Sequence, residues 1–158
     1  MKVFTISLFG HRKIGNVIFV EHELELIIRK LLYEKEYVEF LVGRDGEFDQ
    51  IAASVIHRCK RVYREENSSL VWIMPYPTAN FRDNEDSFRE YYDEIEVCDS
   101  ASTQHFKAAF KTRNQQMVDR SDLVIFYVDH KNGGAYQTMQ YAQKQAKAYI
   151  NIFEDPAI

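Results

Sequence analysis

The chain has 158 residues, 46% of them hydrophobic and 28% charged, which fits one globular domain with its own core. Its 20 basic and 24 acidic residues give a net charge of −4, which argues against nucleic acid as a partner. The longest apolar runs are far shorter than the roughly 20 residues of a membrane helix, and the N-terminus lacks a secretory signal. We therefore expect a cytoplasmic protein with no membrane partner.

Five short runs of β-branched, aliphatic and aromatic residues predict strands covered on both faces, as in a parallel sheet. They are residues 3–9, 38–42, 70–74, 123–128 and 149–153. Apolar residues recur with helical spacing between the first three runs, from Val17 to Leu31 after an Asn16 cap and from Phe48 to Val62. The alternation predicts an α/β fold, a Rossmann-like doubly wound three-layer sandwich with a mostly parallel sheet of about five or six strands.

The least regular region is residues 75–102, interpreted as an acidic insertion or lid within a single domain spanning 1–158. Its residues 82–99 hold eight acidic residues and two arginines, and a short acidic helix with Phe88, Tyr91 and Tyr92 inward fits them. The alternatives are a solvated face, a lid and a subunit contact.

Cys59 and Cys98 are too few for a disulfide framework, and no Cys/His spacing suggests a zinc site. Buried thiols are the simplest interpretation of both. We predict no metal and no cofactor.

In an open α/β sheet, ligands bind beyond the carboxyl ends of the strands, so the residues that follow each predicted strand form the candidate site. A glycine pair at the start of a helix, Gly133-Gly134, lets the backbone approach a phosphate, although such a pair also serves as a simple turn. Arg12 and Arg44 follow neighbouring strands and could flank the same anion, or each could form a surface ion pair.

Arg113 lies on an otherwise apolar helical stripe, so its charge needs a buried partner. Asp119 or Asp122 could supply an ion pair, and a bound anion is the alternative. In a single helix from Thr103, a rise of about 1.5 Å per residue leaves Arg113 roughly 15 Å below the crevice. A ligand contact therefore requires a break in the helix near residues 110–112.

Three segments together resemble the SLOG superfamily: residues 10–12 after the first strand, residues 113–122 before a later strand, and Gly133-Gly134 followed by Thr138. That group includes the LOG phosphoribohydrolases and the Rossmann domain of DNA-processing protein A. The likeness covers most of the chain and is greatest to the small bacterial SLOG proteins of unassigned activity.

The resemblance implies that the glycine pair and Thr138 hold a 5′-phosphate and that Arg113 serves catalysis. The family's Lys is replaced by Asn114, and aligning Thr138 requires a one-residue insertion. Tyr141 then stands where the catalytic Glu belongs, and tyrosine is poorly suited to stabilise an oxocarbenium-like centre. Glu47 or Asp45 could substitute for that carboxylate, or act as a helix cap or a helix-dipole partner.

Residues 121–124 and Tyr141-Ala142 also resemble nucleoside 2-deoxyribosyltransferases, whose nucleophilic Glu corresponds to Thr138 here. Three hypotheses remain: a binder of a nucleotide or nucleotide-derived ligand, an N-glycosyl hydrolase or transferase, and a nucleic-acid-handling domain. Whether the chain is an enzyme stays open, and the resemblance implies a homodimer or higher homo-oligomer, to which Tyr91 and Tyr92 could contribute a contact. The catalytic candidates are Glu47 and Arg113, and the ligand-binding candidates are Gly10, His11, Arg12, Gly43, Arg44, Gly46, Asn114, Gly133, Gly134, Ala135, Tyr136 and Thr138.

Overall fold

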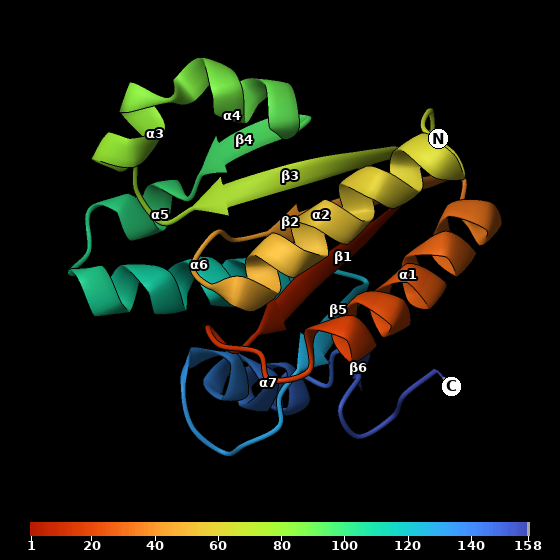
Figure 1. The fold of residues 1–158 in the computed structure, drawn as a ribbon. Coiled ribbons are helices and arrows are strands. Elements are labelled where there is room, and N and C mark those ends of the chain that lie inside the picture. Colours follow the sequence, from red (N-terminus) through yellow and green to blue (C-terminus); the bar gives the residue numbers. More distant parts are fainter. Residues whose placement is uncertain (158) are drawn as a thin grey trace.

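The computed structural model describes residues 1–157 and contains a six-stranded, wholly parallel sheet with helices on both faces (Figure 1). The order of the strands is β4-β3-β2-β1-β5-β6, which confirms the predicted Rossmann-like, doubly wound sandwich. The strands are β1 (Val3–Gly10), β2 (Tyr37–Val42), β3 (Ser68–Met74), β4 (Glu94–Val97), β5 (Leu123–Tyr127) and β6 (Tyr149–Asn151). The helices are α1 (Val17–Glu34), α2 (Glu47–Val62), α3 (Ala79–Asp83), α4 (Glu85–Tyr91), α5 (Asp99–Ser102), α6 (Phe106–Arg120) and α7 (Gly134–Lys144).

The sheet separates two hydrophobic layers, because neighbouring side chains of a strand point to opposite faces. In β1, Ile6 and Leu8 belong to the layer beneath α1 and α2, whereas Phe9 belongs to the layer beneath α5, α6 and α7. Both faces of the central strands are thus covered, which explains their nearly continuous apolar sequences. Asn16 caps α1 as expected, since its side chain accepts the Phe19 amide at 3.4 Å.

The acidic segment 75–102 is part of the sheet. It contributes the edge strand β4, which pairs with β3, and three short helices. Strand β4 was not predicted, since its sequence, Glu-Ile-Glu-Val, is short and only half apolar. The segment is held to the sheet by Trp72, whose ring contacts the rings of Phe81, Phe88 and Tyr92. Phe88 faces inward as expected.

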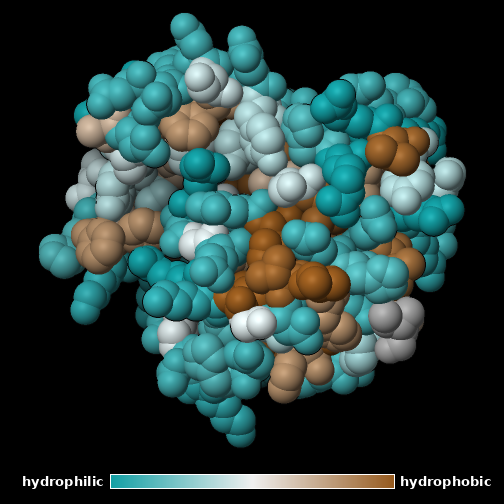
Figure 2. Space-filling view, viewed as in Figure 1, coloured by the Kyte–Doolittle hydropathy of each residue, from teal (hydrophilic) through white to brown (hydrophobic). Residues whose placement is uncertain are grey.

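Of the two tyrosines considered for a subunit contact, Tyr92 faces inward as the acidic-helix interpretation expected, and Tyr91 is half-buried. Tyr92 is only 2% exposed, and Tyr91 stacks on His57 at 4.7 Å. Tyr92 is therefore part of the hydrophobic core, and its side chain is not exposed for contact with a second chain. Exposed apolar side chains occur instead at the start of α1, where Ile18 is 83% exposed. Figure 2 shows apolar residues gathered over the neighbouring helices α1 and α2, surrounded by hydrophilic residues.

Cys59 and Cys98 are both buried free thiols, as expected. Among residues 1–157, no helix is both long enough and apolar enough to span a membrane.

Candidate functional site

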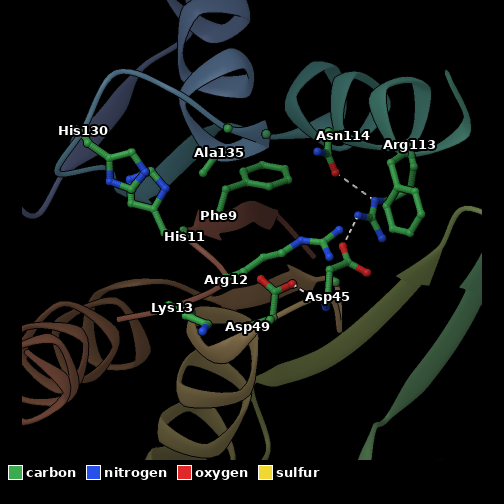
Figure 3. Close-up of a pocket in the computed structure, with 16 residues that line it drawn as sticks. Phe9, His11, Arg12, Lys13, Asp45, Asp49, Arg113, Asn114, His130 and Ala135 are labelled. Carbon is green, nitrogen blue, oxygen red and sulfur yellow. Dashed lines mark hydrogen bonds and ion pairs between the residues drawn. The ribbon is translucent and has the colours of Figure 1, made fainter. Parts of the chain in front are cut away.

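A cavity of about 390 Å³ opens at the carboxyl edge of the sheet, where the order of the strands reverses between β1 and β5. Chain segments leave these two neighbouring strands in opposite directions, which creates the crevice typical of doubly wound folds. Figure 3 shows Arg12 reaching across this cavity between Phe9 and Asp49. The lining residues are Phe9, Gly10, His11, Arg12, Lys13, Gly43, Asp45, Gly46, Asp49, Phe110, Arg113, Asn114, His130, Gly133, Gly134 and Ala135.

Arg113 lines this cavity although helix α6 is unbroken from Phe106 to Arg120. The break expected near residues 110–112 is therefore unnecessary, because the helix does not begin at the level of the crevice. Arg113 lies seven residues before the end of α6, about 10 Å along the helix axis. This brings it level with the end of β3, where its Nη1 donates to the Ile73 carbonyl at 2.9 Å.

The partner of the Arg113 charge is Asp45, in the loop after β2, and neither Asp119 nor Asp122. Asp119 accepts the Tyr141 hydroxyl at 2.7 Å, and Asp122 accepts the Thr5 amide at 2.8 Å. The Arg113 side chain is 2% exposed and uses three of its five N–H donors on protein acceptors. The guanidinium therefore joins three elements at the wall of the cavity.

Asn114 links this arginine to the first turn of α7. Its side-chain oxygen accepts the Arg113 Nε–H at 2.9 Å, and its amide donates to the Thr138 hydroxyl at 3.2 Å. Thr138 in turn donates to the Gly134 carbonyl at 2.8 Å. Thr138 is buried and does not line the cavity, so it supports the start of α7 from behind.

Helix α7 begins at the predicted glycine pair, and both glycines face the cavity. Gly133 has φ +90°, a backbone conformation that favours glycine, so the turn alone explains this residue. A Cβ on Gly134 would meet nothing within 4 Å, so neither φ nor packing demands glycine there. Ala135 also lines the cavity, whereas Tyr136 does not and packs against the second hydrophobic layer.

Two other predicted glycines are required by packing. A Cβ on Gly10 would lie 2.2 Å from the Phe48 ring, and one on Gly46 would lie 2.5 Å from Arg12 Cα. Both glycines let the loops after β1 and β2 meet at the cavity. At Gly43 a Cβ would crowd the Asp45 and Asp49 carboxylates at 3.0 and 3.1 Å.

Arg44 and Glu47 do not line the cavity. The Arg44 guanidinium lies 4.9 Å from the centre of the Phe88 ring and bonds the Tyr92 hydroxyl, so it does not flank an anion together with Arg12. The Glu47 carboxylate accepts the Ile14 amide at 2.8 Å, which stabilises the loop after β1. It caps no helix, since α2 has no side-chain cap, and its place in the first turn of α2 fits the alternative of a helix-dipole partner.

The carboxylates that do line the cavity are Asp45 and Asp49. Burial, together with the nearby Asp45 carboxylate, raises the pKa of Asp49 to about 7. Asp49 also accepts the Asp45 amide at 2.9 Å. Sequence reasoning missed Asp49, because its position in the first turn of α2 looks like an ordinary helix-terminal charge; the spacing of the two acids by one helical turn was the available signal.

His11 follows β1 and meets His130, which follows β5, in a parallel stack with ring centroids 3.6 Å apart. His11 is 7% exposed and accepts the Asp129 amide at its Nε2. Burial and the neighbouring His130 lower the pKa of His11, while Asp129 acts in the opposite sense. His130 was not predicted as a site residue.

Tyr141, at the position aligned with the family Glu, lines a second cavity that shares Arg12, Phe110, Asn114 and Gly134 with the first. Its hydroxyl hydrogen-bonds Asp119, and this bond raises the pKa of Tyr141. The position aligned with the family Glu therefore carries a hydroxyl group that is bound to Asp119, and no carboxylate of its own.

These features define a Rossmann-like α/β protein with a cavity lined by charged, aromatic and glycine residues at its topological switch point. The chain belongs to the family named YpsA and described as "YspA SLOG family", whose model matches residues 2–154. The resemblance to SLOG proteins inferred from the three short segments is thereby confirmed. A search of curated proteins found no match.

Solved structures with the same fold include DNA processing protein A from Streptococcus pneumoniae, with a TM-score of 0.66 and 14% identity over 92% of this chain. The same protein from Helicobacter pylori, studied for its single-stranded DNA binding mode, has a TM-score of 0.59 and 17% identity over 92% of this chain. The chain spans 49% and 63% of the lengths of these two proteins. The structural-genomics target TM1055 has a TM-score of 0.56 and 16% identity over 92% of this chain and 72% of its own.

Proposed function

We propose that the chain binds a nucleotide or a nucleotide-derived molecule, with a phosphate at the Gly133–Gly134 start of α7. The observation that carries this proposal is the convergence of that helix start with Arg12 and Lys13 in one cavity at the switch point. Amides in the first turn of a helix lack intrahelical acceptors, and the helix dipole favours an anion there. Because Arg113 is already paired with Asp45, Arg12 is the better candidate for direct contact with the phosphate.

The proposal is tested by thermal shift with nucleoside mono- and diphosphates, ADP-ribose and NAD. A ligand at about 100 times its Kd adds about 2.7 kcal/mol, which raises the Tm of a chain of this size by about 5–10 °C. We expect Gly134→Asp to remove the shift by repulsion between carboxylate and phosphate, while the matched Gly134→Ala keeps it. The Cβ atom that both variants add at Gly134 would meet nothing within 4 Å. An equal shift in Gly134→Asp, or with unphosphorylated nucleosides, would refute a phosphate at this helix.

Cleavage of an N-glycosidic bond is the second candidate function, and the carboxylate pair Asp45 and Asp49 favours it. With a pKa near 7, Asp49 can hold a proton for the departing base, while Asp45 is ion-paired with Arg113. Water would then add to the sugar carbon and give its proton back to the Asp49 carboxylate. Free base released from a nucleoside 5′-monophosphate, measured by chromatography, tests this reaction.

We expect any such release to be lost in Asp49→Asn and kept in Glu47→Gln, since Glu47 lies outside the cavity. Loss in Glu47→Gln alone would restore Glu47 as the catalytic residue. The absence of free base with every nucleotide that shifts the Tm would leave binding as the function.

Single-stranded DNA belongs in the same panel, because the protein from Helicobacter pylori was studied for its binding of single-stranded DNA. The net charge of −4 had argued against a nucleic-acid partner, but the fold shared with DNA processing protein A makes DNA a candidate ligand. A DNA-induced shift that survives Gly134→Asp would favour a nucleic-acid surface outside the cavity.

A homodimer also remains a prediction, and sedimentation at high concentration tests it.

A further inference from the structure

We propose that His11, Asp129 and His130 form a binding site for a transition-metal ion of the Zn²⁺ type at the rim of the cavity. The three residues come from loops that follow the paired strands β1 and β5, in which Gly10 lies opposite Tyr127. The register of the sheet therefore brings them together. The inference is independent of the nucleotide proposal, because it concerns the metal alone.

The geometry of the ligand atoms suits such an ion. Asp129 Oδ1 lies 3.3 Å from His11 Nε2 and 2.7 Å from His130 Nδ1, and one ligand atom from each residue lies within 4.8 Å of the others. Metal–ligand distances of about 2.0–2.2 Å in a tetrahedral site place neighbouring ligand atoms about 3.3 Å apart. Small movements of the exposed His130 and Asp129 side chains, with release of His11 Nε2 from the Asp129 backbone amide that it accepts at 3.2 Å, would complete the site.

The chemistry of the donors selects the class of metal. Two imidazoles and one carboxylate suit Zn²⁺, Co²⁺ or Ni²⁺, whereas Mg²⁺ prefers oxygen ligands alone. His11 is fixed by burial, which limits the entropy lost when the ion binds. Three protein ligands leave a tetrahedral ion one position for water or another ligand, and both histidines line the cavity.

A second group of potential ligands, Glu39, Glu94 and Glu96, lies elsewhere among the described residues. Arg120 already forms ion pairs with Glu39 at 3.0 Å and with Glu96 at 2.9 Å. That group therefore has its own cation and offers only oxygen. The histidine cluster differs because, among residues 1–157, Asp129 is paired with the two imidazoles and with no Lys or Arg.

The experiment is calorimetric titration of the chelator-treated full chain with Zn²⁺, together with the visible absorption of Co²⁺, in the absence of nucleotide. We expect one saturable ion per chain. His130→Ala and Asp129→Asn should each weaken binding at least tenfold, while His22→Ala, an exposed histidine on α1, should leave it unchanged. Mg²⁺ should not compete. The exposure of His130 and Asp129 allows both substitutions without disturbing the core.

Three outcomes would overturn the site: no saturable Zn²⁺ binding, unchanged affinity in His130→Ala, or an equal loss in His22→Ala. In each case the cluster is only a hydrogen-bonded stack, held by the Asp129 amide on His11. Nucleotide shifts measured in the presence of chelator report separately on the proposed function. Failure of either proposal therefore leaves the other testable.

Discussion

The buried Arg113 and the partly exposed Asp45 form an ion pair that joins the middle of α6 to the loop after β2. The same guanidinium bonds the end of β3 through the Ile73 carbonyl. One side chain thus holds together three segments that are far apart in the sequence. Its principal role in the structure described here is to position the wall of the cavity.

Removing this guanidinium should destabilise the fold strongly. Arg113→Met removes the three hydrogen bonds of a buried guanidinium and leaves the partly exposed Asp45 carboxylate without its partner, at a cost of about 2 kcal/mol or more. The matched variant Arg44→Met loses one exposed cation–π contact and one long hydrogen bond, so we expect a loss below about 1 kcal/mol. Urea denaturation measures both. Similar losses in the two variants would contradict the structural role of Arg113.

We also expect the effects of substituting Arg113 and Asp45 on stability to be coupled. Once Arg113→Met is present, Asp45→Asn should cost little, because no positive partner remains for the carboxylate. The double variant should therefore lose less stability than the sum of the single variants. Simple additivity in a double-mutant cycle would mean that the contact contributes nothing.

The raised pKa of Asp49 predicts a pH-dependent stability. Between the ordinary value of 3.8 and about 7, the unfolded chain loses the Asp49 proton while the folded chain keeps it. This group therefore lowers the free energy of unfolding as pH rises through that window. Asp49→Asn, which can still accept the Asp45 amide, should gain stability relative to the natural chain between pH 4 and about 7. Urea denaturation at several pH values in this range gives the difference in the free energy of unfolding between Asp49→Asn and the natural chain. A difference that does not change with pH would show that the pKa of Asp49 is not raised.

Gly10 should tolerate no side chain. Gly10→Ala places a methyl group 2.2 Å from the Phe48 ring, so the strand and α2 must separate, at a cost of about 1–3 kcal/mol. Gly15→Ala, where nothing lies within 4 Å and φ is not positive, should be neutral or slightly stabilising. Thermal unfolding compares the two variants. A neutral Gly10→Ala would show that the loop after β1 adapts easily.

The sequence by itself predicted the architecture, because buried strands and amphipathic helices leave a local periodic signal. Its strand runs correspond to β1, β2, β3, β5 and β6, and its glycine pair starts α7 as expected. It did not reveal β4, whose edge position needs few apolar residues.

The make-up of the site was decided by the tertiary structure. The direction of a loop side chain depends on packing between distant segments, so proximity in sequence could not separate Arg12, which lines the cavity, from Arg44, which turns to Phe88. The same reason explains why Asp49 faces the cavity, whereas the Glu47 carboxylate accepts the Ile14 amide in the loop after β1. Local periodicity is thus sufficient to specify helices, strands and layers, whereas contacts between distant segments determine which charged side chains lie together at the cavity.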